Sequence, residues 1–168
     1  ASDKVYDGTT DAVVTFEAEP LAGDTVEVSG TGQFADKNVG TNKKVTPKDV
    51  VITGPDADNY TGTGSTASTT ASITAKSIQI EKITVEDKVY DGTTEAVITA
   101  TFKGAVDDVS YTYTAAFESP NVGKDKPVSA EITLEGDSAK NYTLANGKAT
   151  GTGNITRAPA PYDESDIP

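Results

Sequence analysis

The residues best placed for chemistry are two recurring pairs of aspartates, Asp7 with Asp91 and Asp24 with Asp107. Two carboxylates can serve as general acid and base, as in glycosidases, when they face each other across a cleft. Asp7 and Asp91 each precede a glycine, however, and Asp-Gly is typical of tight turns. We therefore expect these aspartates to cap turns rather than to catalyse a reaction.

The composition removes the commonest catalytic and metal-binding side chains. The 168-residue sequence contains no His and no Cys, so it offers no imidazole base, thiolate nucleophile or zinc–thiolate site. Residues 56–59, Asp-Ala-Asp-Asn, alternate oxygen ligands but lack the later glutamate of a calcium loop. We expect no enzyme activity, no cofactor and no bound metal.

The net charge of −12 limits the classes of partner. Nucleic acids and anionic membranes would be repelled by a strongly acidic chain. No apolar run approaches the length that spans a bilayer, so we expect no membrane insertion of this segment.

Tyrosines are the candidate binding residues. Exposed rings could stack on sugars, but a tyrosine near a turn more often packs its ring and bonds its hydroxyl locally. We expect the Tyr90 ring to be half-buried and to hold the Asp91-Gly92 turn to its unit. The candidates are Tyr6, Tyr60, Tyr90 and Tyr142.

The chain contains an internal duplication. Residues 3–10, Asp-Lys-Val-Tyr-Asp-Gly-Thr-Thr, return unchanged as residues 87–94, an offset of 87 − 3 = 84. An Asn-Val-Gly segment and an Asn-Tyr segment also recur, and both are predicted turns. In the Asn-Val-Gly turn we expect Asn and Gly at positions that can take a positive φ. The predicted turn residues are Asp7, Gly8, Asn38, Gly40, Asn59, Asp91, Gly92, Asn121, Gly123 and Asn141.

Apolar residues alternate with polar ones between turn signals, and no window shows a helical period. This pattern predicts an all-β fold of two tandem immunoglobulin-like β-sandwich repeats. The joint Ala75-Lys76-Ser77 lacks Gly and Pro, which indicates an elongated arrangement. We expect the first repeat at residues 1–76, the second at 77–158, and a Pro-rich acidic linker at 159–168.

The two repeats are not expected to be complete copies. Residues 77–86 are predicted to form a pair of strands with no counterpart before Asp3, so the first repeat is expected to lack its first strand. We also expect a strand over residues 11–16, where Ala12, Val14 and Phe16 alternate.

The repeated landmarks resemble the YDG-type repeat of bacterial surface proteins. They are Lys-Val-Tyr-Asp-Gly-Thr-Thr, Asn-Val-Gly, Ala-x-Asn-Tyr and a closing Ile-Thr strand, in two copies. The resemblance implies a stalk or adhesive module of an extracellular, adhesin-like protein on a bacterial cell surface. It implies neighbouring repeats as partners, with an extracellular glycan or host protein as the alternative, and it brings no catalytic residues.

Overall fold

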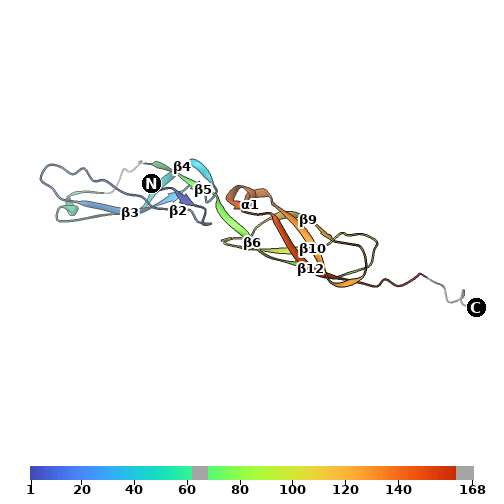
Figure 1. Ribbon diagram of the computed structural model, residues 1–168. Coiled ribbons are helices and arrows are strands. Elements are labelled where there is room, and N and C mark those ends of the chain that lie inside the picture. The colour runs from blue at the N-terminus through green and yellow to red at the C-terminus, as the bar shows by residue number, and fades with distance from the viewer. Residues whose placement is uncertain (62–67, 162–168) are drawn as a thin grey trace, which may run out of the picture. The chain divides into compact units, whose positions relative to one another are not determined.

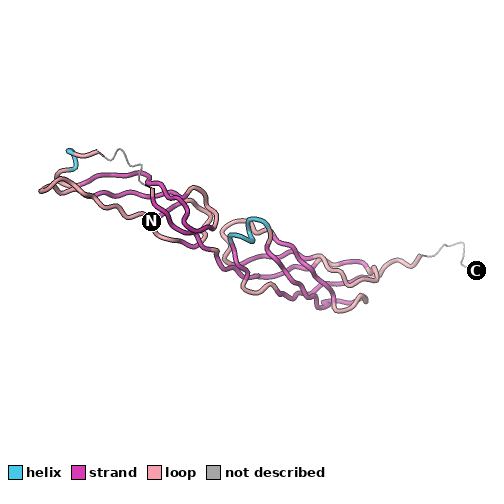
Figure 2. The backbone as a smooth tube through the Cα atoms, turned by 90° about the horizontal axis from the view of Figure 1, so that it is seen from above, coloured by secondary structure: helices cyan, strands magenta, loops and turns pink. Residues whose placement is uncertain are grey.

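The computed structural model describes residues 1–61 and 68–161, and its regular structure is almost entirely β-strand (Figures 1 and 2). The predicted all-β class is confirmed. The chain divides into two compact units. Unit 1 contains Ala1–Lys76 together with Lys140–Thr143, and unit 2 contains Ser77–Ala139 and Leu144–Pro168. Part of the predicted linker, residues 162–168, lies outside the described residues.

Five strands of unit 1 form one sheet in the order β1-β5-β4-β3-β2. They are β1 (Lys4–Val5), β2 (Asp11–Ala12), β3 (Glu27–Phe34), β4 (Gly40–Thr53) and β5 (Thr69–Thr74). β1 runs parallel to β5, with Lys4 opposite Ile73, whereas the other neighbours are antiparallel. A two-residue parallel pair forms few ladder bonds, so β1 needs further attachment.

The other strands form a four-stranded sheet in the order β7-β12-β10-β9 and a three-stranded sheet in the order β11-β6-β8. They lie in unit 2, except that Lys76 of β6 and Tyr142 and Thr143 of β11 belong to unit 1. Strands β9, β10 and β12 lie side by side in Figure 1. The strands are β6 (Lys76–Val85), β7 (Lys88–Val89), β8 (Ile98–Lys103), β9 (Tyr111–Phe117), β10 (Gly123–Leu134), β11 (Tyr142–Leu144) and β12 (Lys148–Thr156).

The core of unit 2 draws on both sheets. Ile98 comes from β8 and Val128 from β10, and Ile80 and Ile83 of β6 pack against the same cluster. The alternation of buried and exposed residues along β10 places every second side chain in this core. The buried cluster consists of Ala96, Ile98, Phe117, Val128, Ala130, Ile132 and Ile155.

The core of unit 1 uses the equivalent positions. Phe34, Val45 and Ile73 are 1%, 0% and 1% exposed, and they match Phe117, Val128 and Ile155 of unit 2. Since the same positions of the repeat are buried twice, the period-2 pattern identifies the inward face of each strand correctly.

The segment after β2 differs between the units. The strand predicted over residues 11–16 ends at Ala12. The residues that follow Ala12 are equivalent to β8 of unit 2, and β8 pairs with β6. No described strand of unit 1 corresponds to β6. Without that neighbour the segment has no ladder to join, although its residues still alternate in burial.

Short helices stand where the sequence predicts only turns. A 3-10 helix covers Ala57–Asn59, and α1 covers Gly136–Asn141 at the equivalent point. Gly136 enters α1 with φ of 59°, a value that glycine adopts without strain. Asp137 in the first turn and Lys140 in the last turn suit the helix dipole. No helix among the described residues is long and apolar enough to cross a membrane.

A substitution at Gly153 tests the packing between the two sheets of unit 2. A Cβ atom there would lie 2.6 Å from Val85 Cγ1 and 3.3 Å from Phe117 Cε1. Gly153→Ala should therefore cost about 2 kcal/mol of unfolding free energy by overpacking. Thr150→Ala, at an exposed position of the same strand, should stay within about 0.5 kcal/mol of the parent. Urea unfolding measures both, and equal midpoints for Gly153→Ala and the parent would refute the prediction.

Candidate functional site

The repeated motif of unit 1 is organised around the ammonium group of Lys4. Lys4 Nζ donates to Asp7 Oδ1 at 2.8 Å, to the Thr9 carbonyl at 3.0 Å and to the Asp11 carbonyl at 2.7 Å. It also lies 5.4 Å from the centre of the Phe34 ring, within reach of a cation–π interaction. The Lys4 side chain, which projects from β1, thus contacts β2, β3 and the turn between β1 and β2.

The turn itself fixes the carboxylate that Lys4 contacts. Asp7 Oδ1 accepts the backbone N–H and the hydroxyl of Thr9, both at 2.9 Å. Gly8 has φ of 77°, which a residue with a Cβ adopts only at a cost. Asp, Gly and Thr therefore each have a separate part in this turn.

Unit 2 repeats the bonds of the lysine to the aspartate and the threonine. Lys88 Nζ donates to Asp91 Oδ1 at 2.9 Å, to the Thr93 carbonyl at 3.0 Å and to the Thr93 hydroxyl at 3.2 Å. It lies 5.6 Å from the centre of the Phe117 ring. Gly92 has φ of 78°. We call the Lys4, Asp7 and Thr9 cluster, and its equivalent Lys88, Asp91 and Thr93, the lysine clusters.

The lysine clusters keep their aspartates ionised. At Asp7, partial burial acts to raise the pKa, but hydrogen bonds from Lys4 and Thr9 together outweigh it and lower the pKa below 3.8. At Asp91, bonds from the Thr93 N–H, Lys88 and the Thr93 hydroxyl lower the pKa to about 2. A carboxylate this acidic and this fully bonded is a poor general acid or base near neutral pH.

The first aspartate of the motif attaches it to the neighbouring strand. Asp3 Oδ1 accepts the Ser72 N–H at 2.7 Å, and Asp87 Oδ1 accepts the Asn154 N–H at 2.9 Å. These bonds lie beside the short parallel pairs, β1 with β5 and β7 with β12.

A second lysine explains the glycine of the Asn-Val-Gly segments. The expectation of positive φ at Asn38, Gly40, Asn121 and Gly123 was wrong, because the positive φ values lie beyond them, 50° at Asn42 and 49° at Asp125. A Cβ at Gly40 would lie 3.1 Å from Lys43 Cδ, and one at Gly123 would lie 3.0 Å from Lys126 Cδ. The glycines therefore make room for a lysine side chain.

These second lysines are bonded locally. Lys43 Nζ contacts Asp36 Oδ1, and the carboxyl of Asp36 has a pKa below its usual 3.8 mainly because of that bond. Lys126 is 7% exposed, and its ammonium donates to the Ser119 hydroxyl at 2.7 Å and to the Asn121 carbonyl.

The candidate tyrosines do not share one environment. Tyr6 and Tyr142 are each 2% exposed and meet edge to face, with ring centres 5.3 Å apart. Tyr60 donates its hydroxyl to Asp24 Oδ2 at 2.6 Å and accepts the Leu21 N–H at 2.9 Å. The bond to the Asp24 carboxylate is the main reason that the pKa of Tyr60 is raised.

Tyr90 is 44% exposed, which fits the expected half-buried ring, whereas its equivalent Tyr6 is 2% exposed. The turn is held by Lys88 and Thr93, and Tyr90 contributes its backbone N–H, which donates to the Thr156 carbonyl at 2.8 Å. Removing the ring should therefore cost less than removing the buried ring of Tyr6.

The remaining candidates do not converge on a metal. Asp56 Oδ2 accepts the Thr25 N–H at 2.7 Å, and Asn59 is exposed. Across residues 1–61 and 68–161, no three acidic side chains come together in a cluster suited to a cation.

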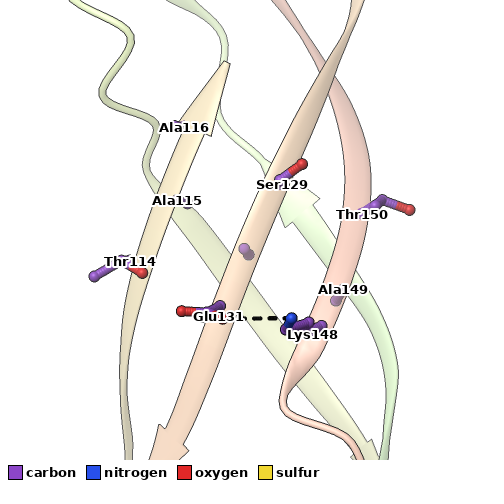
Figure 3. Close-up of a pocket in the computed structure, with 9 residues that line it drawn as sticks. Thr114, Ala115, Ala116, Ser129, Glu131, Lys148, Ala149 and Thr150 are labelled. Atoms are coloured by element: carbon purple, nitrogen blue, oxygen red, sulfur yellow. Dashed lines mark ion pairs between the residues drawn. The ribbon is translucent and has the colours of Figure 1, made fainter. Parts of the chain in front are cut away.

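The exposed face of the four-stranded sheet carries a shallow hollow (Figure 3). It is lined by small or polar side chains of β9, β10 and β12, and Lys148 Nζ lies 4.0 Å from Glu131 Oε1 across it. The lining includes no aromatic ring on which a sugar could stack. The geometry fits an open sheet surface better than a ligand pocket.

Sequence reasoning missed several residues that contact the lysine clusters or the Asn-Val-Gly segments. It gave no part to Thr9 and Thr93, to the rings of Phe34 and Phe117, or to Lys43 with Lys126. Each pair recurs at the repeat spacing, for example 117 − 34 = 83. The signal in the sequence that could have identified them is this recurrence of the same residue type in both repeats.

Replacing Lys88 by Met tests the lysine cluster of unit 2. Met keeps an apolar stem beside Phe117 but removes the bonds to Asp91 and Thr93. Because bonds to charged groups are stronger than neutral ones, the melting temperature should fall by roughly 5 °C. Lys82→Met, at an exposed position of β6, is the control. A Lys88→Met chain that melts with the control would refute the cluster's role in stability.

Acid should weaken unit 2 through Asp91. Its folded-state pKa of about 2 lies below the usual 3.8, so its bonds add stability above pH 3.8, and this stability is lost as the pH falls toward 2. Thermal unfolding between these values should show a smaller acid loss for Asp91→Asn than for the parent. Asp108→Asn, at an exposed position, should follow the parent. An unchanged acid loss in Asp91→Asn would show that this carboxylate is not involved.

The comparisons with known proteins bear on these repeated clusters. The YDG domain matches the chain in two segments, residues 1–71 and 74–151. No curated protein and no solved structure matches this chain. The matched segments include both lysine clusters and cover most of the sequence. The chain belongs to the YDG domain family.

Proposed function

We propose that this chain is a non-enzymatic structural module, composed of two tandem YDG repeats with immunoglobulin-like β-sandwich folds. In this proposal it serves as a stalk segment of a bacterial cell-surface, adhesin-like protein, outside the cell. The observation that carries the proposal is the lysine cluster. The recurring polar side chains bond to their own unit, as a residue set selected for holding strands together would do.

A stalk also needs a stiff connection between its repeats. β5 ends at Thr74 and β6 begins at Lys76, so a single residue separates the two strands. The sequence there contains no Gly or Pro, and such a joint has few freely rotating residues.

Small-angle scattering of the chain in solution tests the stalk function. The parent should behave as an extended particle of nearly fixed length. A variant with a Gly/Ser insertion after Ala75 is the control and should show a broader range of lengths, because flexible linkers behave as random coils. A compact particle, or a parent as variable as the insertion variant, would overturn the proposal.

A second function is favoured by the exposed rim near Tyr90. Tyr90 and Val122 are 44% and 47% exposed, which is high for large apolar side chains. An aromatic ring in this position suits the face of a sugar or an apolar side chain of a host protein. A glycan array with the parent and Tyr90→Ala decides it. Binding that Tyr90→Ala loses would support this function, and absence of binding by the parent would count against it.

A further inference from the structure

One end of unit 1 carries a small, fully covered site around Tyr6. Asn141 and Tyr142, which belong to the same compact unit, cover it. The Tyr142 ring meets the Tyr6 ring at an interplanar angle of 82°. The Val39 N–H donates to Asn141 Oδ1 at 3.0 Å, and Asn141 Nδ2 donates to Asn38 Oδ1 at 3.3 Å.

Unit 2 presents the same residues uncovered. Tyr90, Asn121 and Val122 are equivalent to Tyr6, Asn38 and Val39. Tyr90 is 44% exposed where Tyr6 is 2% exposed, and Val122 is 47% exposed. We call Tyr90, Asn121 and Val122 the Tyr90 surface.

The local fold of the two sites is the same, so folding differences do not explain the exposure. Val5 and Val89, the residues before the tyrosines, are both 53% exposed. The side chains of Lys4 and Lys88 are both 18% exposed. The difference at the tyrosines therefore comes from the segment that covers Tyr6.

The chain also contains a second copy of the covering segment. Asn59-Tyr60 is equivalent to Asn141-Tyr142. Asn59 is exposed at the end of the 3-10 helix Ala57–Asn59. The bonds of the Tyr60 hydroxyl to Asp24 and Leu21 hold its side chain in place, so little entropy remains to be lost on docking.

We infer that the Tyr90 surface is a docking site for the Asn59-Tyr60 turn of a second copy of this chain, in a head-to-tail contact between YDG repeats. In this contact the Val122 N–H donates to Asn59 Oδ1, Asn59 Nδ2 donates to Asn121 Oδ1, and the Tyr60 ring meets the Tyr90 ring edge to face. This inference rests on the proposed tandem-repeat organisation.

The contact is heterologous, because the two surfaces differ and lie on different units. Each molecule therefore offers one of each, and association continues in an open series rather than closing into a dimer. The area is small, so between separate molecules the contact is weak, and it becomes strong only where repeats are covalently joined.

Nuclear magnetic resonance of the full-length, 15N-labelled chain tests the docking. Between about 20 µM and 1 mM, a range that detects millimolar affinities, the amide signals of Val122 and Tyr60 should move together. Tyr90→Ser and Asn59→Ala should each abolish this movement. Asp58→Ala, in the same turn as Asn59, should retain it.

A mixture of the two disabled chains makes the test specific. Asn59→Ala keeps the Tyr90 surface, and Tyr90→Ser keeps the Asn59-Tyr60 turn. Equal amounts should restore the shift of Val122 in the first chain and of Tyr60 in the second. A parent without concentration-dependent shifts at about 1 mM, shifts that persist in Tyr90→Ser, or a mixture that restores nothing would each overturn the docking.

The result of the docking experiment can be distinguished from the result of the scattering experiment on the stalk function. Scattering measures a single dilute molecule, whereas docking joins two molecules at high concentration. An extended particle without self-association would overturn the docking alone. Glycan binding at Tyr90 without self-association would overturn it in favour of the glycan-binding function.

Discussion

The fold of unit 1 depends on how the two ends of its repeated motif are kept together. In unit 1 the motif supplies β1 and β2, which are consecutive in sequence but lie at opposite edges of the five-stranded sheet. Each has two residues, too few for a stable ladder by itself. Lys4, on β1, donates to the carbonyl of Asp11, on β2, and so joins the two edges directly. The sheet is thereby held in a curled form, and its edges are less available to foreign strands.

Much of the fold follows from local sequence rules, because those rules act over a few residues. The alternation along residues 123–134 identifies which side chains are buried, and Asp-Gly identifies the turn that needs a positive φ at Gly8. The strand expected over residues 11–16 failed for a different reason. A strand needs a neighbour, and the neighbour of the equivalent β8 is β6, which has no counterpart among the described strands of unit 1.

The candidate site was harder to predict, since its contacts join residues distant in the sequence. Nothing next to Gly40 in the chain shows that the Lys43 side chain passes over it. The tyrosines also show that contacts with distant residues determine the environment of a side chain. Tyr6 and Tyr90 have identical neighbours from residue 3 to 10 and from 87 to 94, yet one is buried and the other exposed. In repeat proteins, an exposed aromatic ring is therefore weak evidence for a ligand until the covering segment of its counterpart is known.

The lysine clusters also determine which chemical conditions the module tolerates. Domains of this size commonly rely on disulfide bonds or structural metals to supplement a small core. This chain has no cysteine and no histidine, and its strand ends are joined by ammonium groups, carboxylates and backbone carbonyls. Reductants, which break the bonds of disulfide-linked domains, have no disulfide to reduce in it, since it has no cysteine. Because the chain has no cysteine, its folding includes no step of disulfide oxidation.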